Sequence, residues 1–330
     1  MVGGRMNGRQ KHDILINERT KNKLKELPDC VTEWYYNLLA SDLTSNTCND
    51  YVNKVALFIN YCGSKDLSEI KQSTVDKYFI FIREKEVDGT IVETSDSYRQ
   101  TTWCALNKFF EFLHTRNYIS TNYVKQIVKP KNRDLERINQ NRIYLTKKDF
   151  KHIIDAARNG RVIKNRLRNE TILTILMATG MRIAALVSID VDDIDFENKT
   201  LTVIDKGTKR HLYYLSDQVV DILNSYVIER NRCALIQEKG LFISKTTGER
   251  MSIESVKEVV ERCTKNALGK KLSPHKLRAG FCSILYKETH DIEFVRRAVG
   301  HSDIKTTQRY ISVDDTERRK ASTIMNNIFE

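Results

Sequence analysis

Features that would place the chain in a membrane or outside the cell are scarce in this sequence. Its seven cysteines are scattered through 330 residues without a Cys-x-x-Cys pair, which argues against a disulfide framework and against a zinc site. No apolar run approaches the roughly 18 residues that a membrane-spanning helix needs. The polar, basic beginning also lacks the apolar centre of a signal peptide. We therefore expect a cytoplasmic protein in a reducing compartment.

Acidic residues are too few to balance the basic ones. There are 55 Lys and Arg against 43 Asp and Glu, a formal net charge of +12, and the pI is about 9.2. Residues 129–168 alone hold 13 Lys and Arg against 4 Asp and Glu. A basic run is often only a solvated surface, but the overall excess indicates an anionic partner. No Walker motif or metal-spaced carboxylate cluster indicates ATP or a metal ion.

Composition divides the chain into five parts. Residues 1–28 are polar and basic and are expected to form a short helical or flexible arm. Residues 29–128 show helical periodicity and predict a small all-helical domain. Residues 129–143 have few apolar side chains and many charges, as an interdomain linker does. A new pattern fills residues 144–312, and residues 313–330 form a tail of helical character.

Four helices are expected in the first domain, over residues 31–40, 45–62, 73–86 and 95–117. Ser45 and Ser73 fit the N-cap position, and Gly63 and Gly89 lie where helices could stop. We interpret the aromatic residues of this part as core rather than as base-stacking groups. They are Trp34, Tyr35, Phe58, Tyr61, Phe79, Trp103, Phe109, Phe110 and Phe112.

Reactive and basic side chains recur at fixed places in the second half. A buried helix at 171–178 and a turn at Gly180 lead to Arg182, at the start of the next helix. Residues 200–205 and 211–215 read as a hairpin with Lys206 at its tip. The pattern therefore predicts that Arg182 follows the buried helix and its turn, and that Lys206 follows the first strand of the hairpin.

A second pair of segments completes this set. Ser273 and Pro274 fit the N-cap and first position of a helix, and the three-residue spacing puts His275 and Arg278 on one helix face. Tyr310 follows nine residues after His301. A phenol with a pKa of about 10 is a poor nucleophile at neutral pH, so it needs positioning and a base. The surrounding cations suit a phosphate electrophile.

Taken in chain order, these side chains resemble those of the tyrosine recombinase, or phage integrase, family, which cuts and rejoins DNA. The resemblance is strong over residues 144–330 and general before them. It implies a mainly α fold with a small antiparallel β-sheet in the C-terminal domain: a helical core-binding domain and a mixed α/β catalytic domain. The matching catalytic residues are Arg182, Lys206, His275, Arg278, His301 and Tyr310.

The resemblance also implies a mechanism. Tyr310 would attack a backbone phosphate and leave a 3′-phosphotyrosyl intermediate and a free 5′-hydroxyl, without metal or ATP. His275 would take the phenolic proton, and Lys206 would protonate the departing 5′ oxygen. Arg182 and Arg278 would bind the non-bridging oxygens, because planar guanidinium groups match phosphate geometry. The remaining histidine, at position 301, would orient the phosphate.

Double-stranded DNA is the partner that the resemblance implies. Contacts to its backbone are expected from Lys129, Lys131, Arg133, Lys209 and Arg210. The family acts as a homo-oligomer on DNA, a tetramer in the synaptic complex, with accessory DNA-bending or directionality proteins in some cases. We expect a nucleoid-associated enzyme of a mobile genetic element or a resolvase of replicon dimers.

The tail offers two interpretations. Ile324 and Ile328 are four residues apart, as are Met325 and Phe329, which gives an apolar helix face. This face could dock on its own domain or, as in the family, on a neighbouring protomer.

One position departs from the family pattern. Many members carry an acid three residues after the first arginine, where this chain has Ala185. The missing carboxylate predicts altered tuning of His275 or another nearby acid in place of the carboxylate, and it suggests a slow or partner-dependent enzyme. It leaves open a catalytically decayed DNA-binding protein. The similar catalytic set of type IB topoisomerases, which relax DNA as monomers, is the other alternative.

Overall fold

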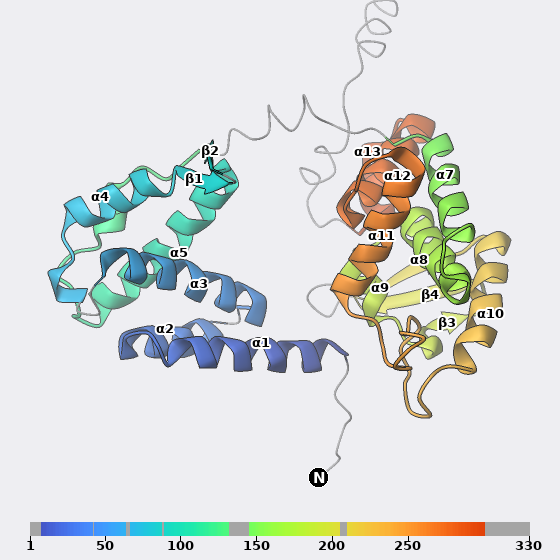
Figure 1. Cartoon of the computed structure of the whole chain (residues 1–330), viewed down its shortest axis with the longest axis horizontal. Helices are drawn as coiled ribbons and strands as arrows, with labels where there is room; N and C mark the ends of the chain where they lie inside the picture. The colour runs from blue at the N-terminus through green and yellow to red at the C-terminus, as the bar shows by residue number, and fades with distance from the viewer. Residues whose placement is uncertain are drawn as a thin grey trace, which may run out of the picture. The chain divides into compact units, whose positions relative to one another are not determined.

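Two separately packed units make up the chain, the N-terminal unit of residues 1–141 and the C-terminal unit of residues 142–330. Figure 1 shows the elements of each in a computed structural model. The structure describes residues 8–41, 43–63, 67–87, 89–131, 145–204 and 210–300. Within those residues, no helix combines the length and apolar character required to cross a bilayer.

Helices dominate the N-terminal unit. Its elements are α1 (Gly8–Leu24), α2 (Asp29–Ala40), α3 (Ser45–Cys62), η1 (Leu67–Glu69), α4 (Gln72–Phe81), β1 (Glu84–Val87), β2 (Thr90–Glu93), α5 (Asp96–Thr115) and η2 (Tyr123–Gln126). Helix α3 spans the predicted residues, but its N-cap is Thr44, whose Oγ1 accepts from the Thr47 N–H at 3.3 Å. Gly63 ends it with a φ of +68°, a conformation that favours glycine.

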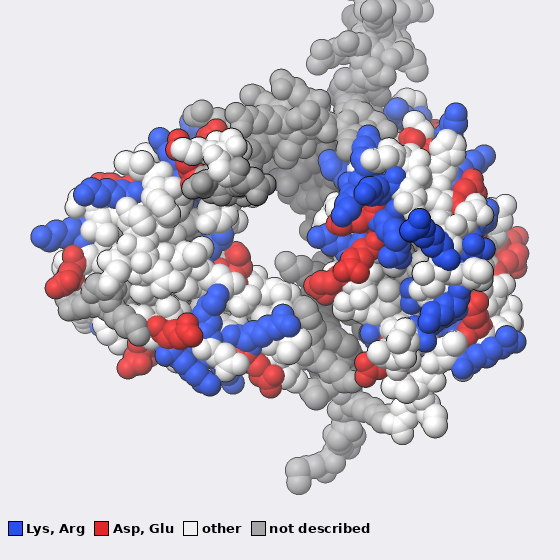
Figure 2. Space-filling view, viewed as in Figure 1, with Lys and Arg blue, Asp and Glu red and all other residues white. Residues whose placement is uncertain are grey.

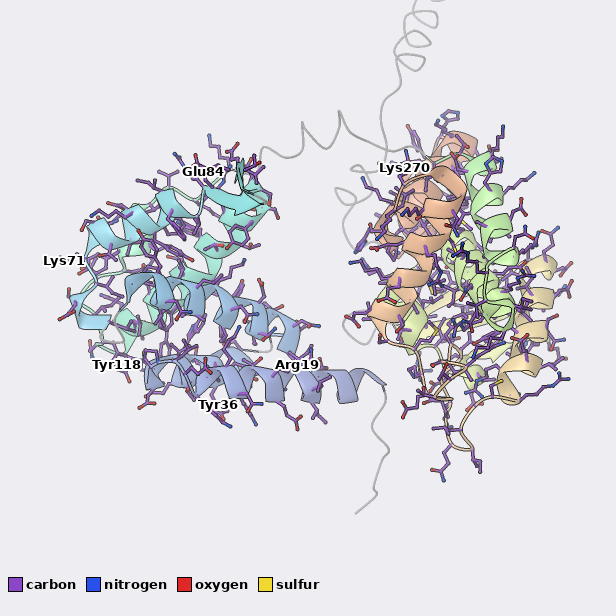
Figure 3. The ribbon with its side chains drawn as sticks, viewed as in Figure 1. Arg19, Tyr36, Lys71, Glu84, Tyr118 and Lys270 are labelled. Carbon is purple, nitrogen blue, oxygen red and sulfur yellow. The ribbon has the colours of Figure 1, made fainter. Side chains whose placement is uncertain are left out.

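The prediction of an all-helical first domain is wrong at one place. The helix expected over residues 73–86 starts at Gln72, with Lys71 rather than Ser73 at its cap, and ends at Phe81. Strands β1 and β2 then form an antiparallel hairpin, whose first residue, Glu84, is labelled in Figure 3. Gly89 lies in its turn with a φ of +74°, so this glycine serves a hairpin instead of a helix end.

Aromatic rings fill the core of the N-terminal unit. Trp34 and Phe109 lie 5.0 Å apart between ring centroids, as do Phe58 and Tyr78. Most of the predicted aromatic core is confirmed, although Tyr61 is exposed. Such rings contribute large apolar areas together with favourable edge contacts.

Helix α1 packs against this core through one face. Ile16, Thr20 and Leu24 are buried, and the Thr20 hydroxyl lies 2.9 Å from the side-chain oxygen of Asn49 on α3. The helical alternative for the first segment therefore holds over Gly8–Leu24.

Helices also surround a small sheet in the C-terminal unit. Its elements are α7 (Lys147–Arg158), η3 (Ile163–Asn165), α8 (Arg166–Thr179), α9 (Ile183–Ser188), η4 (Val191–Asp193), β3 (Ile194–Asp195), β4 (Thr200–Ile204), β5 (Arg210–Tyr214), α10 (Asp217–Asn231), α11 (Ile253–Leu268), α12 (Pro274–Thr289) and α13 (Ile292–Ala298). The three strands are antiparallel in the order β3-β4-β5. The predicted fold class, mainly α with a small antiparallel sheet in this half, is confirmed.

Local signals in the sequence account for several of these elements. Thr146 and Asp149 form the expected capping box: the Thr146 N–H donates to the carboxylate at 2.8 Å, and the Asp149 N–H donates to the threonine hydroxyl at 3.1 Å. The apolar run at 171–178 lies in α8, where Ile172, Leu173 and Ile175 are fully buried. Helix α8 is thus the central helix of the C-terminal core.

Candidate active site

A tight turn between α8 and α9 positions Arg182. Gly180 ends α8 with a φ of +61°, and Arg182 is the N-cap of α9, as the sequence predicted. A Cβ on Gly180 would lie 2.4 Å from Cδ1 of Phe281, so both the backbone angle and the packing require glycine. The Met181 N–H donates to the Thr179 hydroxyl at 3.2 Å and further fixes the turn.

Arg278 connects this turn to a second one. Its side chain is only 3% exposed, and its guanidinium donates to the carbonyl of Gly180 and, at 2.8 Å, to the carbonyl of Val299. The first carbonyl lies two residues before Arg182, and the second lies two residues before His301. The rigid fork of an arginine thereby holds the backbones next to two other predicted catalytic residues.

His275 lies in the first turn of α12, which begins at Pro274 as predicted. Ser273 occupies the N-cap, although its side chain makes no capping hydrogen bond. His275 is exposed as a whole residue, yet the protein packed around it, followed by the charges of Arg278 and Arg182, lowers its pKa. A lowered pKa keeps the imidazole neutral, and so able to accept a proton, at neutral pH.

Exposed basic residues also lie just before α12 in the chain. Lys265, Lys270 and Lys271 are exposed just before it, and Lys270 is labelled in Figure 3. Figure 2 shows Lys and Arg side chains gathered over α11 and α12, with acidic side chains among them. Positive charge at this place suits an anionic ligand.

The structure therefore brings Arg182, His275 and Arg278 together. Lys206, His301 and Tyr310 lie outside the described residues, as does the tail at 313–330. The hairpin predicted around Lys206 is present, because β4 pairs with β5 up to the partners Ile204 and Arg210.

Ala185, which stands where the family pattern has an acid, is a core residue. It is 6% exposed and belongs to the main apolar cluster of the unit. The charges that lower the pKa of His275, on Arg278 and Arg182, are both positive.

The predicted DNA contacts have different surroundings. The Lys129 ammonium lies 5.6 Å from the centroid of the Trp103 ring on α5, and the Trp103 indole N–H donates to the Ile127 carbonyl at 3.0 Å. The beginning of the predicted linker is thus bound to α5. Lys131 and Arg210 are exposed. The two remaining candidates, Arg133 and Lys209, lie outside the described residues.

Sequence reasoning missed His211 and the role of Arg278 as a bridge. The His211 ring lies against Gly300, at 3.2 Å from the position of a Cβ there. The only sequence signal for His211 is its place on the strand that returns from Lys206. Nothing in the sequence indicates that Arg278 binds carbonyls 98 and 21 residues away.

Comparisons with known proteins identify relatives of this chain. The model of the phage integrase family matches residues 143–317. The tyrosine recombinase XerC of Caldanaerobacter subterraneus subsp. tengcongensis is 33% identical over 221 residues, 66% of this chain and 59% of that protein. XerC of Vibrio parahaemolyticus is 27% identical over 295 residues, 86% of this chain and 88% of that protein.

Three solved structures share the fold. XerH recombinase bound to a palindromic difH substrate has a TM-score of 0.66 at 21% identity and covers 86% of this chain and 80% of XerH. The Tn1549 transposon integrase with a circular intermediate DNA has a TM-score of 0.63 at 17% identity, covering 89% and 99%. A lambda integrase tetramer bound to a Holliday junction has a TM-score of 0.62 at 17% identity, covering 86% and 76%.

The class of protein follows from the fold, the grouped Arg182, His275 and Arg278, and these relatives: an enzyme of DNA strand transfer. The chain belongs to the phage integrase family.

Proposed function

We propose that this enzyme recombines DNA at specific sites through a covalent bond to Tyr310. The observation that carries the proposal is the pair of hydrogen bonds that Arg278 donates to the carbonyls of Gly180 and Val299. It draws the Arg182 turn and the backbone before His301 to one place, beside His275. Tyr310, the nucleophile that the family pattern implies, follows nine residues after His301.

The proposed step is a balanced exchange of phosphodiester bonds. The Tyr310 oxygen attacks the phosphorus and the bond from phosphorus to the 5′ oxygen breaks, which leaves a 3′-phosphotyrosine. His275, held neutral by its surroundings, accepts the phenolic proton, and Lys206 gives a proton to the departing 5′ oxygen. A 5′-hydroxyl from a partner strand then reverses the step on new DNA. ATP is not consumed because the bond energy is kept in the intermediate, and the roles that a metal could serve are given to the side chains named here.

The phosphate would be held by three side chains. Arg182 and Arg278 bind its non-bridging oxygens, where charge develops, and His301 orients it. A preorganised donor of this kind is worth about 10²- to 10³-fold in rate. Arg278 in addition shapes the site through its hydrogen bonds to the carbonyls of Gly180 and Val299.

Contacts to the DNA backbone are proposed for Lys129, Lys131, Arg133, Lys209 and Arg210. The first of these lies on the Trp103 ring, so its ammonium would be presented from a fixed part of the N-terminal unit. Phosphate contacts of this type raise affinity without reading sequence.

The assembly would be a homotetramer on two DNA duplexes. Support comes from lambda integrase, which is a tetramer on a Holliday junction in a solved structure. A mobile element is the proposed source, as for the Tn1549 integrase, and accessory DNA-bending or directionality proteins would assist. The site of action is the nucleoid of the cytoplasm.

Trapping on nicked DNA tests the function. The protein would first select its binding site from a pool of random duplexes, and that site would be rebuilt with a nick close to the scissile phosphate. The native chain should give a covalent complex on a denaturing gel, Tyr310→Phe should give none, and Tyr214→Phe, at a tyrosine 81% exposed on β5, should match the native chain. Tight binding of the native chain without any covalent complex would contradict the proposal and favour a decayed DNA-binding protein.

A further inference from the structure

His211 makes an unusually close contact with the chain just before His301. If Gly300 carried a Cβ, this atom would lie 3.2 Å from Nδ1 and 3.3 Å from Cε1 of His211. Gly300 has a φ of +67°, so its backbone favours glycine, and a larger residue there would also press on the imidazole. The ring therefore lies directly on the backbone of the turn.

This contact joins two segments that are remote in sequence. His211 pairs with Val203 across the β4–β5 hairpin, on the strand that follows Lys206 in the sequence. Gly300 precedes His301, and the neighbouring Val299 carbonyl is bound by Arg278. The His211 ring thus connects the hairpin of one proposed catalytic residue to the turn of another.

The orientation of the ring is itself held. The rings of His211 and Tyr213 are 4.4 Å apart between centroids and tilted by 60°, and Tyr213 is buried at 8% exposure. A side chain in contact with both a buried tyrosine and Gly300 can keep the hairpin in a defined position.

We propose that His211 is a positioning residue, whose ring holds the hairpin against Gly300 so that Lys206 reaches the departing 5′ oxygen. The inference rests on the proposed function. In the step that it serves, the bond from the Tyr310 oxygen to phosphorus forms, the bond from phosphorus to the 5′ oxygen breaks, and the Lys206 ammonium gives that oxygen its proton. The role of the ring is packing, so its shape matters more than its nitrogen atoms.

A change of leaving atom separates this role from general damage. A thiol has a pKa of about 8.5, whereas a proton on water has a pKa of about 15.7, so a sulfur leaves without being protonated and an alkoxide oxygen does not. Single-turnover cleavage would be measured on two nicked duplexes of the selected site that differ only by oxygen or sulfur at the 5′ bridging position. The variants are His211→Ala, His211→Phe, Lys206→Ala and, as a matched strand control, Tyr214→Ala.

His211→Ala should cleave the oxygen substrate about 10- to 100-fold more slowly, since a displacement of about 1 Å can cost 10²-fold. On the sulfur substrate it should stay within about threefold of the native chain, in the same pattern as Lys206→Ala. His211→Phe, which keeps a ring, and Tyr214→Ala should resemble the native chain on both substrates. Circular dichroism melting would show that each variant is folded.

Three results would overturn the proposal: no slowing by His211→Ala, equal slowing on both substrates, or His211→Phe as slow as His211→Ala. Failure of the native chain to form any covalent complex on the oxygen duplex would instead overturn the proposed function, and this inference with it. The native arm of the same experiment therefore tells the two failures apart.

Discussion

Each of the two units has an apolar core, but the units differ in their most notable buried side chains. In the N-terminal unit the bulkiest buried groups are the rings of Trp34, Tyr35, Phe58, Tyr78, Phe109 and Phe110. In the C-terminal unit, buried arginines donate to main-chain carbonyls: Arg168 to Ile243, Arg230 to Gly240, and Arg278 to Gly180 and Val299. Apolar burial is non-directional, whereas a hydrogen bond fixes distance and angle.

The difference matches what each unit must do. Packed rings make a stable body but place no particular turn. Arginine side chains that donate to main-chain carbonyls fix individual turns. The turns that Arg278 fixes are those next to Arg182 and His301. In the N-terminal unit the buried charged side chain among the described residues, Lys54, lies over the Tyr98 ring at 4.1 Å, which is again an aromatic contact. Directional hydrogen bonds from buried arginines are thus found in the unit that carries the proposed catalytic residues.

Removal of Arg278 should give the largest loss of function. Arg278→Ala should slow covalent-complex formation on the nicked duplex by about 10²- to 10³-fold or more, because both a phosphate donor and the bridge between two carbonyls are lost. Arg278→Lys should be nearly as slow, since an ammonium cannot reproduce the planar fork. Single-turnover rates of folded protein, verified by circular dichroism, are the measurement. Full activity of Arg278→Lys would show that charge alone suffices.

Truncation of a core ring should instead change stability. Phe58→Ala should lower the free energy of unfolding of the N-terminal unit by about 3 to 5 kcal/mol, because Phe58 is fully buried against Tyr78 and Phe110. Urea unfolding followed by tryptophan fluorescence would report this through Trp34 and Trp103. A cost below about 1 kcal/mol would mean that the rings do not hold this unit.

Two glycines with the same backbone conformation allow a matched comparison between the units. Gly63 and Gly180 end α3 and α8 with φ of +68° and +61°, but a Cβ on Gly63 meets nothing within 4 Å, whereas one on Gly180 meets Phe281 at 2.4 Å. Gly63→Ala should cost about 1 to 2 kcal/mol from the backbone alone. Gly180→Ala should cost more and should also slow cleavage, since Arg278 binds its carbonyl. Equal stability losses and an unchanged rate would contradict the claimed precision of this turn.

The pH dependence of cleavage should reflect the lowered pKa of His275. If the neutral imidazole is the base, the single-turnover rate should fall up to about tenfold per pH unit only below pH about 6.5, the ordinary histidine pKa. The unfolded chain takes up this proton first as the pH falls, so stability linked to neutral His275 is lost below the same pH. His275→Gln should be slower and lack this acidic limb. A limb retained in His275→Gln would assign it to another group.

The smallest expected effect concerns the missing acid. Ala185→Glu should raise the cleavage rate a few-fold if the absent carboxylate makes this enzyme slow, although Ala185 is buried in the apolar cluster and a buried charge lowers stability. The comparison would be made at a temperature where both proteins are folded. An unchanged rate would count against the idea that Ala185 slows the enzyme.

Local sequence signals were enough to predict much of the fold. The β-branched run at 200–204 predicted the β4–β5 hairpin, and Thr146 with Asp149 predicted the start of α7. The hairpin at 84–93 was missed because Glu and Lys, which favour helices, extend the helical pattern after Phe81. The opposing signal for a turn is a single Asp-Gly pair. Short signals are easily outweighed by a longer helical pattern.

The site was predictable in residue type but not in geometry. Arg182, His275 and Arg278 could be chosen from their order and spacing. The Gly180 and Val299 carbonyls could not be chosen as partners of Arg278, because every residue has a carbonyl and only the fold selects one. The contact between His211 and Gly300 depends in the same way on the packing of a strand against a turn 89 residues away in the sequence.

The most direct test of the account is the position of the DNA on the protein. The covalent complex formed on the nicked duplex would be trimmed with nuclease, digested with protease and sequenced by mass spectrometry. The account predicts a nucleotide attached through its 3′ phosphate to Tyr310, and an adduct that forms at least about 10²-fold more slowly in Arg278→Ala. A nucleotide on any other residue, or an adduct formed equally fast without Arg278, would contradict it.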